Sequence, residues 1–227
     1  MSTVKIRFYL LAFAALMSTS AIAQTPASEA TPAKLSGHAA ELKKKALAGD
    51  TKAQLRLGIA YEFGEGVARN VDEAAHWYRI AADRGDPIAQ TNLAYLYENG
   101  RDGVRDLSEA ARWYMRAAVS GFARAEFNLG TLYLQGSGVE RNDEEAAHWI
   151  GLAAEAGCPS ALAALGYLYA NGKGVPRDAR KAADLIQKSA GKNDVNSCAR
   201  FSSHASDSVI AERRSRDQGW KTYGYVW

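Results

Sequence analysis

Two residues near the end of this 227-residue chain stand at a spacing that carries chemistry in some enzymes. Ser189 and Lys192 match the S-x-x-K motif, in which the serine of β-lactamases is the nucleophile. The companion motifs are missing, because no Ser-Asp-Asn follows and residues 221–223 read Lys-Thr-Tyr instead of Lys-Thr-Gly. We therefore treat the match as a coincidence and predict a protein that is not an enzyme. A β-lactam or cell-wall peptide hydrolase is the alternative.

The histidines and cysteines do not form a cluster that predicts a metal site. His76 and His148 each precede a tryptophan but are 72 residues apart, so we expect no shared metal and no cofactor. Cys158 and Cys198 are the two cysteines of the chain. In an oxidising compartment one disulfide between them is expected, and two separate thiols are the alternative.

A period of 36 residues organises most of the chain and predicts stacked repeats. Tryptophan recurs at Trp77, Trp113 and Trp149, and leucine, tyrosine and alanine keep the same interval around it. In each copy a helical pattern is broken by glycine, and an Asn or Asp then marks the start of a second helix. In the first three copies a glutamate three residues later indicates a capping box. The sequence thus predicts an all-α fold, an α/α superhelix (solenoid) of four helix-turn-helix repeats: 51–86, 87–122, 123–158 and 159–194.

The two ends of the stack are also predicted by the period. Residues 37–50 match a second helix without its first, which predicts a half-repeat N-terminal cap. Residues 195–227 keep little of the pattern and predict a degenerate C-terminal cap with an aromatic tail, as a solenoid needs at an open end. We hypothesise that the tail, 218–227, docks on a partner or on another copy. Packing against the last repeat is the alternative.

The first residues have the composition of a secretory signal peptide. Lys5 and Arg7 precede an apolar stretch, and Ala21 and Ala23 form a small-x-small cleavage pattern. We expect a signal peptide at 1–23, a flexible leader at 24–36, and a protein that is periplasmic or secreted with no membrane span after cleavage. Loss of 1–23 lowers the formal charge from +3 to +1, which gives no electrostatic footprint for nucleic acid.

The repeat pattern resembles that of the Sel-one-like repeat (SLR) family, a relative of the tetratricopeptide repeat. The shared pattern is Ala-x3-Leu-Gly-x2-Tyr, Gly-x-Gly-Val, Ala-Ala-x-Trp-Tyr and Ala-Ala-x2-Gly, and it covers roughly 37–194. The second copy has Ala94 for the first glycine, and the fourth has Leu185 for the tryptophan. The resemblance implies an α-solenoid whose first helices line a concave face, and a non-catalytic adaptor that binds a protein or peptide there.

The resemblance also implies which residues would contact that partner. Ligand-binding positions of the related repeats, carried onto this register, include aromatic, amide and basic side chains that differ from copy to copy. The candidates are Thr91, Asn92, Tyr95, Arg124, Phe127, Asn128 and Tyr167. Aromatics there would supply rigid contact area, and the two asparagines would bond a peptide backbone. Filling of the inner wall, and solvated asparagines, are the alternatives. We expect a periplasmic signalling or envelope-assembly adaptor, with a secreted host-interaction factor as another alternative.

Overall fold

The computed structural model describes residues 36–100, 105–191 and 198. The predicted signal peptide, residues 24–35 of the leader, and the aromatic tail lie outside this part of the chain. The described residues form helices and no strand. The helices are α1 (Gly37–Leu47), α2 (Thr51–Phe63), α3 (Val71–Asp83), α4 (Pro87–Asn99), α5 (Leu107–Val119), α6 (Ala123–Gln135), α7 (Asp143–Glu155), α8 (Pro159–Asn171) and α9 (Ala179–Ala190).

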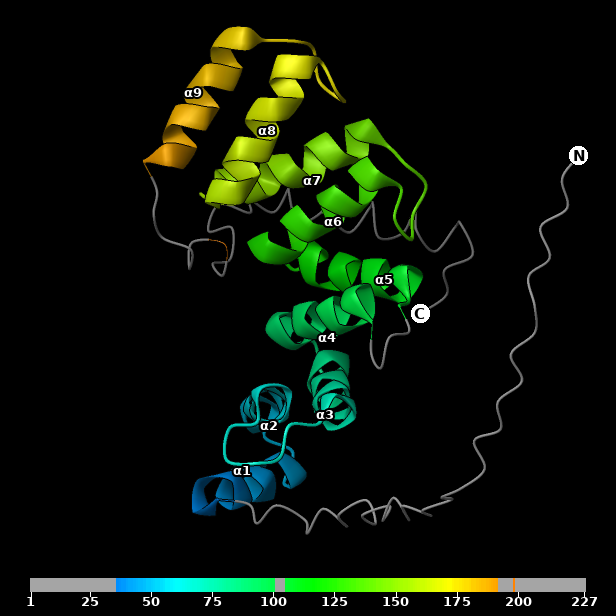
Figure 1. Ribbon diagram of the computed structural model, residues 1–227, viewed down its shortest axis with the longest axis vertical. Coiled ribbons are helices and arrows are strands. Elements are labelled where there is room, and N and C mark those ends of the chain that lie inside the picture. Colours follow the sequence, from blue (N-terminus) through cyan, green and yellow to red (C-terminus); the bar gives the residue numbers. More distant parts are fainter. Residues whose placement is uncertain (1–35, 101–104, 192–197, 199–227) are drawn as a thin grey trace, which may run out of the picture. The chain divides into compact units, whose positions relative to one another are not determined.

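Each helix packs mainly against the helices that precede and follow it in the chain (Figure 1). The pairs α2–α3, α4–α5, α6–α7 and α8–α9 form the four repeats, and α1 is the half-repeat in front of them. The predicted all-α solenoid is therefore confirmed. None of the described helices is long and apolar enough to cross a membrane.

The core contains the residues that define the period. The leucines Leu57, Leu93 and Leu129 and the tryptophan Trp149 are all fully buried. The glycine after the leucine permits close contact between the two helices of a repeat. A Cβ atom on Gly58 would lie 2.5 Å from the Tyr78 ring, so α2 and α3 approach at a distance that only glycine allows without displacing the tyrosine.

The second helices begin at the predicted residues, but only half of the capping box forms. The Asn70 side chain accepts from the backbone N–H of Glu73 at 3.1 Å, as expected. The reciprocal bond is absent, because the Asn70 N–H donates to the carbonyl of Tyr61 at 2.9 Å. Glu73 instead accepts from the indole Nε1 of Trp77 at 3.2 Å. The glutamate thus orients the tryptophan of its own helix.

The loop between the helices of a repeat lies on the start of the previous repeat's second helix. In the last repeat a Cβ atom on Gly174 would lie 1.8 Å from the carbonyl oxygen of Asp143. Gly138 has the same relation to Leu107, with 2.1 Å to its carbonyl oxygen. The second glycine of the loop is therefore an inter-repeat contact as well as a turn residue.

Candidate functional site

The candidate site is the surface of the first helices, α2, α4, α6 and α8. Tyr95 on α4 and Tyr167 on α8 occupy the same register position two repeats apart, and their side chains are 52% and 51% exposed. Phe127 on α6 is half-buried and packs beside the last repeat's core. Arg124 on the same helix is exposed. These four candidates all present side-chain atoms to solvent on first helices.

Thr91 does not belong to this surface. Its side chain is 2% exposed, and its hydroxyl donates to the carbonyl of Pro87 at 2.7 Å within α4. A ligand on the first helices would therefore not reach it. Thr91 has the register position that Phe127 has one repeat later, but in α4 the side chain at this position is buried, whereas in α6 it is half-buried.

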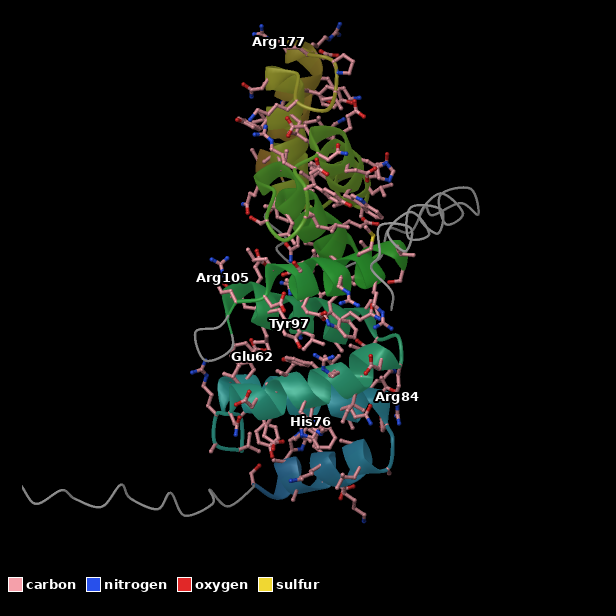
Figure 2. The ribbon with its side chains drawn as sticks, turned by 90° about the vertical axis from the view of Figure 1, so that its right-hand side faces the viewer. Glu62, His76, Arg84, Tyr97, Arg105 and Arg177 are labelled. Carbon is pink, nitrogen blue, oxygen red and sulfur yellow. A yellow bond between two sulfur atoms is a disulfide. The ribbon has the colours of Figure 1, made fainter. Side chains whose placement is uncertain are left out.

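The two candidate asparagines lie beside buried tyrosines of the preceding repeat. Tyr78 on α3 donates to the Glu62 carboxylate at 2.6 Å, and the Asn92 side chain on α4 lies close enough to the phenol to influence its ionisation. We call Glu62, Tyr78 and Asn92 the first polar triad. Its three members come from three successive helices and join the first repeat to the second. Figure 2 shows Glu62 on the side of the first repeat nearest α4.

The same arrangement recurs one period later. Tyr114 on α5 donates to Glu98 on α4 at 2.8 Å, and the Asn128 side chain on α6 lies close enough to the same phenol to influence its ionisation. We call these three residues the second polar triad. Tyr95 lies close enough to Tyr114 to influence its ionisation. The exposed Tyr95 therefore lies close to the second polar triad.

Burial fixes the protonation state of the two central tyrosines. Tyr78 and Tyr114 are completely buried, and burial followed by the neighbouring glutamate raises the pKa of each phenol far above its usual range of about 10. The asparagines act weakly in the opposite direction. Both phenols therefore remain protonated and donate to a carboxylate. They cannot serve as general bases at neutral pH.

The third joint between repeats has no polar triad. Leu134, Ile150 and Ala164 stand at the register positions of the glutamate, tyrosine and asparagine, and they belong to one hydrophobic cluster. All three polar residues are replaced by apolar ones at this joint, so none of the three side chains lacks a suitable partner. The replacement can be read from the sequence only when positions on three different helices are compared with those one period earlier.

A second group that the sequence did not predict surrounds Trp113. The guanidinium of Arg116 lies 4.5 Å from its ring centroid and that of Arg79 lies 5.7 Å away. Arg79 also donates to the phenol of Tyr97, which Figure 2 shows on α4, and Arg116 pairs with Asp83 at 3.6 Å. The tryptophan is 5% exposed. The cation–π contact of Arg79 attaches α3 to α5, and its hydrogen bond to Tyr97 attaches α3 to α4.

The sulfur atoms of Cys158 and Cys198 are joined in a disulfide, with their Cα atoms 4.4 Å apart. Cys158 is fully buried and stands at the N-cap of α8, where it makes no side-chain cap bond. The bridge connects the last repeat to the segment that follows α9.

Ser189 and His76, two residues whose types could do chemistry, make contacts within the helix stack. The Ser189 hydroxyl donates to the carbonyl of Pro159 at 2.9 Å and so attaches α9 to α8; Lys192 lies outside the described residues. His76 is exposed and packs edge-on against Trp77, with ring centroids 5.3 Å apart. No group of three or more potential metal ligands occurs among the described residues.

Comparison with known proteins assigns the family. The Sel1 repeat model matches four segments of the chain, residues 51–86, 87–121, 123–158 and 159–194. The chain belongs to the Sel1 repeat family. Sel1 repeats generally mediate protein–protein interactions, and the family is typically non-enzymatic. No curated protein matches the sequence.

Two solved structures of Sel1 repeat proteins are similar to this one. A protective antigen present in uropathogenic Escherichia coli strains, which displays an SLR fold, is 34% identical over 80% of this chain and 40% of its own, with a TM-score of 0.66. A Sel1 repeat protein from Oxalobacter formigenes is 35% identical over 66% of this chain and 43% of its own, with a TM-score of 0.63. The chain thus spans about two fifths of the length of these relatives.

Proposed function

We propose that this Sel1 repeat protein is exported and binds a protein or peptide partner through the surface of its first helices. The observation that carries the proposal is the exposure of Tyr95 and Tyr167. Both are half-exposed at the same register position, whereas Tyr78 and Tyr114 on the second helices are completely buried. Large aromatic side chains that remain in solvent on a rigid helix are typical of binding hot spots.

The residues beside the tyrosines suit an extended peptide. Asn92 and Asn128 are half-buried and lie beside the triad tyrosines. A side-chain amide has two donor hydrogens and an acceptor oxygen, so capacity for a peptide backbone remains. Because each asparagine is half-buried on a rigid helix, its amide would lose little conformational freedom on meeting the partner, which lowers the entropy cost of binding.

Export is part of the same proposal. Lys5, Arg7, the apolar stretch after them and the Ala-Ile-Ala at 21–23 favour cleavage after Ala23. A disulfide between the two cysteines also suits an oxidising compartment. We place the mature protein in the periplasm, as an adaptor in envelope signalling or assembly. N-terminal sequencing of the mature protein tests the first step, because export with cleavage predicts a chain that begins at Gln24.

Photo-crosslinking in the native envelope tests the binding surface. A photoreactive amino acid at position 95 or 167 should capture the same partner, while one at Leu47, which is 70% exposed on α1, should not. With the purified partner, Tyr95→Ala combined with Tyr167→Ala should weaken the Kd roughly 700-fold, since two hot-spot losses of about 2 kcal/mol each sum to about 4 kcal/mol. Equal affinity for the double variant, the Leu47→Ala control and the wild type would refute the assignment of this surface.

A secreted host-interaction factor is the second candidate, because one similar structure is a protective antigen of uropathogenic strains. Fractionation separates the two functions. A mature protein retained in the periplasm supports the adaptor, and one recovered from the medium of intact cells supports the secreted factor.

A further inference from the structure

One face of α9 is exposed although the same face is buried in every earlier repeat. The Ile186 side chain is 50% exposed, and Ala183 and Ala190 on the same face are exposed as well. Their counterparts on α3, α5 and α7 are at most 6% exposed. These counterparts are Ala75, Ala111 and Ala147; Tyr78, Tyr114 and Ile150; and Ala82, Ala118 and Ala154.

The difference arises from the position of α9 at the end of the described stack. The first helix of the next repeat covers α3, α5 and α7, as the contacts α3–α4, α5–α6 and α7–α8 show. Among the described residues no helix follows α9. An uncovered apolar helix face at the end of a solenoid lowers solubility and promotes association, so a terminal unit usually covers it. We call Ala183, Ile186 and Ala190 the end face.

The disulfide brings the following segment to this face. Ser189 at the end of α9 contacts Pro159 at the start of α8, and Cys158 immediately precedes that proline. Because Cys198 is bonded to Cys158, with 4.4 Å between their Cα atoms, the chain leaves Cys198 beside the C-terminal end of α9. The part of the chain that follows therefore starts next to Ala190 of the end face.

The register of Cys198 agrees with this placement. Cys198 is 36 residues after Leu162 and corresponds to Gln54 and Gln90 of the earlier first helices. Those glutamines lie against the end of the preceding second helix, where each Nε2 donates to an alanine carbonyl at 3.0 Å. Cys198 is half-buried and packs against the core of the last repeat.

We propose that residues 199–227 of this chain lie over the end face and close the stack where the first helix of a fifth repeat would lie. The segment is long enough, because 29 residues follow Cys198 and the first helices have 13. Phe201 stands at the register position of the core leucine. A segment tethered beside its site also has a high effective concentration, which favours it over a second copy of the protein.

Thiol labelling in the full chain tests the proposal. Ile186→Cys and Tyr167→Cys are a matched pair, because the two native side chains are 50% and 51% exposed on different faces of the last repeat. With the native disulfide verified by mass spectrometry, a maleimide should label position 186 at least about tenfold more slowly than position 167. The difference should be independent of protein concentration. It should disappear in a chain that ends at residue 199 and keeps the disulfide.

Three results would overturn the proposal. Equal labelling of positions 186 and 167 in the full chain would show that the end face is open. Protection that increases with protein concentration would assign the face to a second copy. Protection of position 167 instead of 186 would place the segment on the first-helix surface. If the shortened chain does not fold, the comparison within the full chain decides by itself.

Discussion

The first polar triad provides the sharpest test of how the repeats are joined. Tyr78→Phe removes one hydroxyl and leaves the ring in place beside Gly58. Glu62 loses the donor that now lies 2.6 Å from its carboxylate, and Asn92 loses the hydroxyl that lies beside its amide. The substitution thus changes hydrogen bonding at the joint with little change in packing.

The expected loss is larger than that of a neutral hydrogen bond. A hydrogen bond to a charged group contributes about 1.5–3 kcal/mol, and a partner left without its bond adds a desolvation cost. We expect Tyr78→Phe to lower the free energy of unfolding by about 2 kcal/mol, which shifts Tm by roughly 4–8 °C for a chain of this size. Urea denaturation followed by circular dichroism measures the free energy, and calorimetry measures the Tm.

The third joint supplies a matched control from the same chain. The combined change Glu62→Leu, Tyr78→Ile and Asn92→Ala copies into the first joint the residues found at 134, 150 and 164. Both joints keep the glycine that faces the exchanged side chain, since a Cβ atom on Gly58 or Gly130 would lie 2.5 or 2.6 Å from it. Replacing all partners of a buried bond by apolar groups of fitting shape is close to neutral.

The triple variant should therefore be more stable than Tyr78→Phe, although it carries three substitutions. A triple variant less stable than the single one would refute the idea that the triad acts as one exchangeable unit. A cost below about 0.5 kcal/mol for Tyr78→Phe, the usual effect of a surface substitution, would show that the triad contributes little.

The remaining predictions concern pH, the disulfide and the loop. Folding raises the pKa of Tyr78 above the unfolded value of 10.0, so the contribution of its protonated phenol to the free energy of unfolding is complete below pH 10 and is lost as the pH rises above 10. Tyr78→Phe should therefore make the free energy of unfolding fall less steeply above pH 10, by up to about 1.4 kcal/mol per pH unit. Reduction of Cys158–Cys198 should cost roughly 3–4 kcal/mol in urea denaturation, since the separation is 40 residues, and a variant with both cysteines changed to alanine should not respond to reductant. Gly174→Ala should lower the free energy of unfolding by about 1–3 kcal/mol more than Gly172→Ala. Both glycines have φ +65°, but a new Cβ atom would lie 1.8 Å from its nearest neighbour at position 174 and 3.4 Å at position 172; equal Tm values for the two variants would contradict the inter-repeat contact.

The sequence predicted well what depends on one helix at a time. The 36-residue interval and the position of Asn70 gave the helix starts, because apolar spacing and an N-cap are properties of a local segment. The reciprocal half of the capping box failed for a tertiary reason. The carbonyl of Tyr61 takes the N–H of Asn70, and that carbonyl belongs to the preceding helix.

The candidate site was predicted less completely, because its residues contact three helices at once. The register placed Tyr95 and Tyr167 on exposed positions of the first helices. It did not show that Thr91 is covered, nor that Asn92 lies beside Tyr78 of the preceding repeat. A one-dimensional pattern gives the angle of a side chain around its own helix. It does not give the neighbour that the next repeat places against it.

The contrast between the joints explains how this stack can vary its surface without losing its fold. Each repeat contacts only its neighbours, so stability is approximately a sum over repeats and joints. A polar triad such as Glu98, Tyr114 and Asn128 can therefore be exchanged for an apolar set such as Leu134, Ile150 and Ala164 at one joint without any change at the next. The exchange also alters the surface, because the glutamate and the asparagine are only half-buried. The same substitutions that preserve a joint thus change the chemistry offered to a partner, from amide and carboxylate at the first two joints to aliphatic side chains at the third.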